Sequence, residues 1–119
     1  MKVFITGIAG FLGSHIADRM IELGHDVHGC DNLLGGYKDN IPAKATWRQV
    51  DCQYLSTMTE LMEGCELLIH TACTAYEGLS VFSPCLVTQN TSQISASVFT
   101  AAVRNKIKRI VNCSSTHRS

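Results

Sequence analysis

Charge, long apolar runs and closely spaced cysteine pairs are all scarce in this chain. Charged residues make up 17% of it, below the roughly 25% usual in globular proteins. Ten Lys and Arg balance 10 Asp and Glu with no block of either sign, which excludes the basic footprint of a nucleic-acid or anionic-membrane protein. No apolar run approaches the roughly 20 residues that span a bilayer, and residues 1–6 lead into a glycine turn rather than a secretory signal. We therefore expect a cytoplasmic protein without nucleic-acid or membrane partners.

The six cysteines form no Cys-x-x-Cys pair, and no His lies near them at the spacing of zinc ligands. We expect reduced thiols, several of them buried as small apolar side chains, and no metal site. The cysteines stand at positions 30, 52, 65, 73, 85 and 113.

The 119 residues, 45% of them hydrophobic, suffice for about one domain with its own core. Short apolar runs that end at turns predict five strands, at Lys2–Thr6, Asp26–Asp31, Thr46–Val50, Glu66–Thr71 and Ile107–Cys113. Apolar residues at helical spacing predict helices at Phe11–Leu23, Tyr54–Met62 and Ser83–Asn105. This alternation predicts an α/β fold, a Rossmann-type doubly wound parallel sheet in the order 3-2-1-4-5. Ligands should bind where the order switches, near residues 7–13 and 70–74.

Three glycines join the first strand to the first helix. Gly7 allows a sharp turn, Gly10 leaves room for a pyrophosphate, and Gly13 lets the helix pack closely on the strand. The N–H groups at the start of the helix then face the phosphates. With a strand before it and a helix after it, this spacing predicts a dinucleotide site.

Asp31 ends the second strand, 18 residues beyond Gly13. Its carboxylate can accept hydrogen bonds from both hydroxyls of an adenosine ribose and would repel a 2′-phosphate, so NAD is favoured over NADP. The alternative is an Asp that only begins a loop turn with Asn32.

Two buried polar side chains have structural interpretations. Asn90 falls on the apolar face of the third predicted helix, with Leu86, Ile94 and Val98, and backbone groups of neighbouring strands can satisfy its amide. We expect His70 to be a packed, hydrogen-bonded strand histidine rather than an acid or base.

The pattern Thr-Gly-x-x-Gly-Phe-x-Gly, then Asp31-Asn32, Asp51, His70-x-Ala72, Asn90 and Cys113-Ser114-Ser115, resembles the extended short-chain dehydrogenase/reductase family. Within it, the chain is most similar to the nucleotide-sugar epimerases and dehydratases. The resemblance covers the whole chain but only the first part of such an enzyme. It therefore implies an NAD-binding domain, residues 1–119, that is incomplete after its fifth strand.

The resemblance also assigns residues to the cofactor. It implies that Asp51 contacts the adenine amino group, that Cys52 offers a backbone N–H beside it, and that the backbone of His70-Thr-Ala-Cys73 runs along the dinucleotide. Cys73 replaces the alanine usual in the family. The full set of implied cofactor contacts is Gly7, Ala9, Gly10, Phe11, Leu12, Gly13, Asp31, Asn32, Asp51, Cys52, His70, Ala72 and Cys73.

Ser115 resembles the family's catalytic serine or threonine, which hydrogen-bonds the reacting sugar oxygen; the alternative is a serine that simply ends a strand. Family chemistry also needs a Tyr-x-x-x-Lys pair, whose tyrosine exchanges the hydroxyl proton while hydride passes to or from the nicotinamide. None of Tyr37, Tyr54 and Tyr76 has Lys four residues later.

We therefore expect the NAD-binding part of an epimerase or dehydratase, which takes a nucleotide sugar only when a further segment completes it. The alternatives are a non-catalytic NAD sensor or one part of a split enzyme, assembled as a homo-oligomer or with a complementing chain. A methyltransferase that uses S-adenosylmethionine would share the glycine turn and the ribose acid. The Ser-Ser pair and the three-residue glycine spacing disfavour it.

Overall fold

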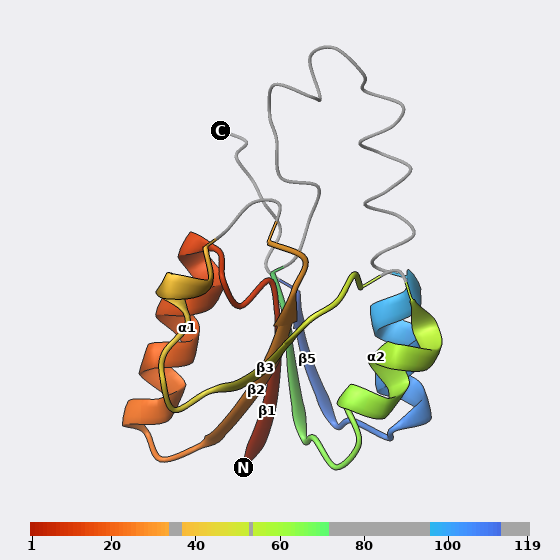
Figure 1. Ribbon diagram of the computed structural model, residues 1–119. Helices are drawn as coiled ribbons and strands as arrows, with labels where there is room; N and C mark the ends of the chain where they lie inside the picture. The colour runs from red at the N-terminus through yellow and green to blue at the C-terminus, as the bar shows by residue number, and fades with distance from the viewer. Residues whose placement is uncertain (34–36, 53, 72–95, 113–119) are drawn as a thin grey trace, which may run out of the picture.

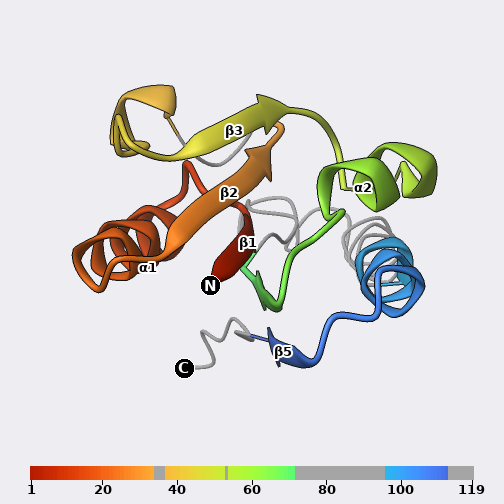
Figure 2. The ribbon, with the colours of Figure 1, turned by 90° about the horizontal axis from the view of Figure 1, so that it is seen from below.

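A computed structural model describes residues 1–33, 37–52, 54–71 and 96–112. Its five strands are all parallel and lie in the order β3-β2-β1-β4-β5 (Figures 1 and 2). They are β1 (Lys2–Thr6), β2 (Asp26–Asp31), β3 (Thr46–Gln49), β4 (Leu67–His70) and β5 (Arg109–Asn112). The predicted sheet order is therefore confirmed, and the order switches between β1 and β4.

Helices cover both faces of the sheet, as a doubly wound fold requires. Figure 1 shows α1 (Phe11–Glu22) on one side and α2 (Leu55–Leu61) with the helical residues 96–104 on the other. A short 3₁₀ turn, η1 (Lys38–Asn40), lies between β2 and β3. Among the described residues, no helix is long and apolar enough to cross a membrane.

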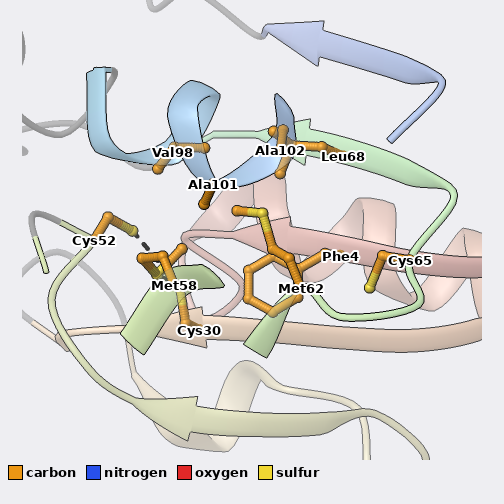
Figure 3. Packing of buried hydrophobic residues seen from close by; sticks show 10 residues of the cluster. All are labelled: Phe4, Cys30, Cys52, Met58, Met62, Cys65, Leu68, Val98, Ala101 and Ala102. Atoms are coloured by element: carbon orange, nitrogen blue, oxygen red, sulfur yellow. Dashed lines mark hydrogen bonds between the residues drawn. The ribbon is translucent and has the colours of Figure 1, made fainter. Parts of the chain in front are cut away.

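The sheet separates two hydrophobic clusters. The cluster under α1 consists of Val3, Ile5, Ile8, Ala17, Val27 and Ile69. The cluster under the other two helices, drawn in Figure 3, consists of Phe4, Cys30, Cys52, Met58, Met62, Cys65, Leu68, Val98, Ala101 and Ala102. Successive residues of β1 alternate between the two, so the strand is buried on both faces, as its continuous apolar run predicts.

Where the structure describes them, the ends of the predicted elements either agree with the observed ends or differ by one or two residues, which is the usual uncertainty at element ends. For the third helix, Val98, Ala101 and Ala102 are buried as predicted. Its start at Ser83 and the residues Leu86, Asn90 and Ile94 lie outside the described residues.

The close packing around Gly29 explains why β2 contains a glycine. A Cβ at this position would lie 2.6 Å from the Ile5 carbonyl oxygen and 2.7 Å from Ile8 Cδ1. The missing side chain lets Ile8 pack directly on β2, which fixes the base of the turn after β1.

Candidate functional site

The turn after β1 is tied to β2 and folds tightly on itself. The N–H of Gly7 donates to the Cys30 carbonyl at 2.9 Å, and the N–H of Gly10 donates to the Gly7 carbonyl at 3.0 Å. Gly7 has φ 73°, in the left-handed region that favours glycine. The first predicted glycine role, a sharp turn, is therefore present in the geometry.

Gly13 and Gly10 differ in what surrounds them. A Cβ on Gly13 would lie 2.8 Å from the Gly7 carbonyl carbon and 3.1 Å from Ile8 Cα, so α1 packs against the turn only because this side chain is absent. Among the described residues, a Cβ on Gly10 would meet only the Gly7 oxygen, at 3.4 Å. Protein packing therefore requires glycine at position 13, whereas the described residues leave room for a side chain at position 10.

The start of α1 is suited to an anion. Gly10 is the N-cap residue and has no side chain with which to cap the helix, and the first turn carries no acidic residue. The first N–H groups of a helix have no intrahelical partners and form the positive end of its dipole. Phe11 and Leu12 are exposed beside them, so a phosphate can approach these N–H groups.

Asp31 is buried and already holds the turn. Its Oδ2 accepts a hydrogen bond from the N–H of Ala9 at 2.8 Å, and its Oδ1 accepts one from the N–H of Leu33 at 2.7 Å. Each carboxylate oxygen has two lone pairs, so each keeps one for a further donor. The carboxylate is fixed in place before any ribose hydroxyl reaches it.

The sequence prediction missed Asn40, which holds the next peptide group, on the other side of the Ala9 Cα. Asn40 Nδ2 donates to the Ala9 carbonyl at 3.1 Å, and the N–H of Tyr37 donates to that oxygen at 3.2 Å. Asp31 holds the N–H of Ala9, and Asn40 and Tyr37 hold its carbonyl, so both backbone groups of this residue in the glycine turn are restrained. The only signal in the sequence was an asparagine in a turn-rich segment, which does not reveal a contact 31 residues away.

Hydrogen bonds also join the ends of β1 and β4, where the strand order switches. The Thr6 hydroxyl accepts from the N–H of Thr71 at 3.0 Å and lies 2.7 Å from His70 Nδ1, to which it can donate its own proton. The Thr71 hydroxyl donates to the Thr6 carbonyl at 2.6 Å. This network fixes the carboxyl ends of β1 and β4 relative to each other, at the point where the strand order switches.

His70 is buried, with its ring edge against Phe99 at 5.5 Å between centroids. Burial lowers the pKa of His70 to about 4, so the imidazole is neutral at physiological pH and, with its proton on Nε2, can accept the Thr6 hydroxyl proton at Nδ1. These contacts support a structural role for the His70 side chain. Its backbone lies at the carboxyl end of β4, at the same edge of the sheet as the glycine turn.

The other predicted cofactor residues follow β2 and β3 at the same edge. Asn32 and Asp51 are half-buried there, and Cys52 is buried with its sulfur 3.5 Å from Cys30. Parallel strands end at one edge, so the structure brings Asp31, Asn32 and Asp51 to the edge that carries the glycine turn.

Four predicted site residues, Ala72, Cys73, Asn90 and Ser115, lie outside the described residues. Within the part of the chain that the structure describes, no cluster of His, Cys, Asp or Glu is arranged to hold a metal ion.

Comparison with known proteins gives concordant matches. The NAD dependent epimerase/dehydratase family matches residues 3–118. A UDP-glucose 4-epimerase of Corynebacterium glutamicum is 35% identical over 86 residues, which are 71% of this chain and 26% of that protein.

Two crystal structures share the fold. The UDP-glucose 4-epimerase of Thermotoga maritima with UDP-glucose has a TM-score of 0.88 at 26% identity, covering 94% of this chain and 37% of that one. The Thermus thermophilus UDP-glucose 4-epimerase complex with NAD has a TM-score of 0.83 at 26% identity, covering 92% of this chain and 36% of that one.

The chain thus spans well under half the length of these relatives. The matched family is NAD dependent, which confirms the cofactor expected from the sequence. The match over residues 3–118, nearly the whole chain, shows that the chain belongs to the NAD dependent epimerase/dehydratase family.

Proposed function

We propose that this chain binds NAD across the carboxyl ends of β2, β1 and β4. One observation carries the proposal: the start of α1, whose N-cap is a glycine, lies directly after a turn whose Ala9 N–H is held by the Asp31 carboxylate. An anion site and a ribose acceptor thereby share one rigid unit. Among the described residues, the space that a Gly10 side chain would occupy is open, which fits a pyrophosphate.

Each group in this unit has a task toward the dinucleotide. The N–H groups at the start of α1 bind the pyrophosphate, and the free lone pairs of Asp31 accept the adenosine ribose hydroxyls. We assign the adenine to the segment after β3, with Asp51 accepting from its amino group and the Cys52 backbone N–H beside it. Asn32, Phe11 and Leu12 line the same edge, as do Ala72 and Cys73 by resemblance to the family.

The whole protein would use this cofactor on a nucleotide sugar. When bound, NAD would supply the hydride-transfer chemistry for the sugar. Ser115 would hydrogen-bond the reacting sugar oxygen, and a tyrosine activated by a lysine would exchange the hydroxyl proton. The 119 residues contain no Tyr-x-x-x-Lys, so we propose that they bind NAD and do not by themselves turn over an epimerase or dehydratase substrate.

A non-catalytic NAD-binding module, or one part of a split enzyme, is the second candidate, and the same missing pair favours it. A second chain that carries Tyr-x-x-x-Lys would restore turnover when mixed with one part of a split enzyme and would not do so with a non-catalytic module. The cytoplasmic location expected from the sequence stays a prediction.

Titration calorimetry of the purified chain with NAD and with NADP tests the binding proposal. We expect saturable binding of NAD and weaker binding of NADP. A coupled assay with UDP-glucose and NAD tests the catalytic part, and we expect no turnover. Absence of NAD binding by a folded chain would refute the proposal that the chain binds NAD. Turnover by the chain alone would refute the proposal that it is not catalytic by itself.

A further inference from the structure

Two thiols meet beneath the proposed adenosine site. Cys30 is the penultimate residue of β2, and Cys52 follows β3. Their sulfur atoms are 3.5 Å apart, and Cys30 Sγ lies 3.9 Å from Met58 Sδ (Figure 3). Neither the proposed binding function nor the family match gives this pair a task.

The backbone holds the pair together. Cys30 is opposite Arg48 in the parallel register of β2 and β3. Beyond the end of β3, the N–H of Val50 still donates to the Asp31 carbonyl at 3.1 Å, and the N–H of Tyr54 donates to the Asp51 carbonyl at 3.2 Å. The second bond closes a turn at Cys52 over the end of β2, so both thiols lie on short, anchored segments.

We propose that Cys30 and Cys52 are a site of reversible oxidation and form a disulfide with a small peroxide. A disulfide has an S–S distance of about 2.05 Å, so the two sulfurs, now 3.5 Å apart, must approach each other by about 1.5 Å. The pair therefore needs little movement to form the bond.

The reaction balances with the peroxide as a two-electron oxidant. The Cys52 thiolate attacks one peroxide oxygen and becomes a sulfenic acid, while the other oxygen leaves as hydroxide and takes up a proton to form water. The Cys30 sulfur then attacks the Cys52 sulfur and expels a second water molecule, for which its own thiol proton is used. Two thiols are oxidised, and one hydrogen peroxide is reduced to two waters.

The surroundings assign the two steps to different residues. Cys52 is 5% exposed and Cys30 is fully buried, so the small oxidant reaches Cys52 first. The hydrogen bond with Cys52, together with burial, raises the pKa of Cys30. Cys30 therefore stays protonated and reacts slowly with the peroxide itself, which leaves it to condense with the sulfenic acid that forms beside it at Cys52.

The bond would connect two parts of the proposed site. Cys30 precedes Asp31, and Cys52 follows Asp51. A covalent link between them would close the loop of residues 30–52 and restrict the opening of the segments that carry both carboxylates. Oxidation would therefore stabilise the folded chain, whether or not NAD binds there.

Peptide mapping of the full chain after brief treatment with hydrogen peroxide tests the proposal. We expect the intact mass to fall by two hydrogen atoms, a cross-linked peptide containing Cys30 and Cys52, and complete reversal by dithiothreitol. The oxidised chain should also melt several degrees higher than the reduced chain. Cys65, buried in the same core, provides the matched control: Cys65→Ser should retain the cross-link, and Cys52→Ser should lose it.

A Cys30–Cys52 link in the unsubstituted chain supports the proposal even if a variant fails to fold. Both cysteines recovered as unmodified thiols, a link from either one to a different cysteine, or a sulfinic acid at Cys52 without a cross-link would overturn it. Calorimetry with NAD is a separate experiment, so failure of the disulfide and failure of the proposed cofactor site are distinguishable.

Discussion

The Asp31 carboxylate accepts a hydrogen bond from the backbone N–H of Ala9 at 2.8 Å. The residue proposed to bind the ribose therefore also positions the turn proposed to bind the pyrophosphate. A substitution at Asp31 that removes the carboxylate would change the proposed ribose contact and the turn at once, because the buried N–H of Ala9 would lose its hydrogen-bond partner. Experiments on this site must separate loss of a ligand contact from loss of turn geometry.

The first prediction concerns Asp31 and the choice of cofactor. The chain should bind NAD more tightly than NADP, and Asp31→Asn should narrow that difference because the side chain loses its charge and half of its acceptor capacity. Losing one charge-assisted hydrogen bond typically costs about 1.5–3 kcal/mol, or roughly 10- to 150-fold in affinity for NAD. Calorimetric titration of both cofactors measures the effect.

Asp18 supplies the control for that experiment, since it is an exposed carboxylate on α1. Asp18→Asn should leave both affinities unchanged. Tighter binding of NADP than of NAD by the unsubstituted chain would contradict the assignment of Asp31.

The second prediction contrasts two glycines of the same turn. Gly10→Val should abolish NAD binding and leave the fold intact, because Gly10 has φ −77° and ψ 172°, which valine adopts readily. Gly13→Ala should instead unfold or strongly destabilise the chain, because its Cβ would lie 2.8 Å from the Gly7 carbonyl carbon. Circular dichroism and calorimetry measure the two effects separately.

The pair serves as its own control, because the larger substitution is expected to be the less damaging to the fold. If Gly10→Val binds NAD with unchanged affinity, the turn is not the phosphate site. If Gly13→Ala has native stability, α1 has more freedom to shift than the packing indicates.

The third prediction concerns Asn40 as a positioning residue for Ala9. Asn40→Ala removes one of the two donors to the Ala9 carbonyl and should weaken NAD binding by about three- to tenfold, since a hydrogen bond contributes roughly 0.5–1.5 kcal/mol. Asn105→Ala is matched chemically, because Asn105 Nδ2 also donates to a carbonyl, that of Thr59 at 2.9 Å, on the opposite side of the sheet. It should lower the free energy of unfolding without changing the affinity for NAD.

Equal weakening of NAD binding in both Asn variants would mean that the effect comes from general loss of stability. Unchanged affinity in Asn40→Ala would show that Tyr37 alone suffices to hold the Ala9 carbonyl.

Local sequence patterns were sufficient to predict the strand, the glycine turn and the acidic residue from which the candidate site is built. The apolar run of β1, the glycine spacing and the acid after β2 are each readable within a few residues, because strand burial, turn geometry and helix starts depend on near neighbours in sequence. The sheet order followed from the alternation of elements and the handedness of their connections.

Contacts between distant segments were not predictable in the same way. Asn40 on the Ala9 carbonyl, Thr71 on Thr6 and Cys52 against Cys30 each join residues that are 22 to 65 positions apart. Their side chains carry no periodicity, and only the folded register determines which of several polar or sulfur-containing residues meet. Gly29 is an intermediate case, since a glycine in a strand indicates a close approach but not which residue approaches.

The fourth prediction is a loss of stability in mild acid that depends on His70. Burial lowers its pKa in the folded chain to about 4 from the ordinary 6.5, so the unfolded chain binds the extra proton at any pH between these values. The contribution is fully present above pH 6.5 and is lost progressively as the pH falls toward 4. Going from about pH 7.5 to about pH 5 should cost about 2 kcal/mol from this residue.

Urea denaturation at both pH values measures the loss. His70→Gln should be less stable at neutral pH and should show a smaller pH dependence than the unsubstituted chain. His15→Gln, at an exposed position on α1, should show the same pH dependence as the unsubstituted chain. An identical slope in all three proteins would place the acid sensitivity elsewhere.

The last prediction concerns the two outer strands, which differ in chemistry. β3 presents Thr46, Arg48 and Gln49 as exposed polar residues, whereas on β5 the consecutive residues Ile110 and Val111 are 42% and 46% exposed. Consecutive strand residues point to opposite faces, so β5 is incompletely covered on both faces, and it is also the outermost strand in the described sheet. An apolar strand with an unprotected edge is a template for pairing with another chain.

We therefore expect the 119-residue chain to self-associate through β5, and sedimentation across a concentration series should detect it. Ile110→Lys should weaken the association, because a charge on an edge strand opposes pairing. Val103→Lys places the same charge at a more exposed position on the helical residues 96–104 and should have little effect. A chain that stays monomeric at every concentration, or one whose association responds equally to both substitutions, would show that the β5 edge does not mediate the contact.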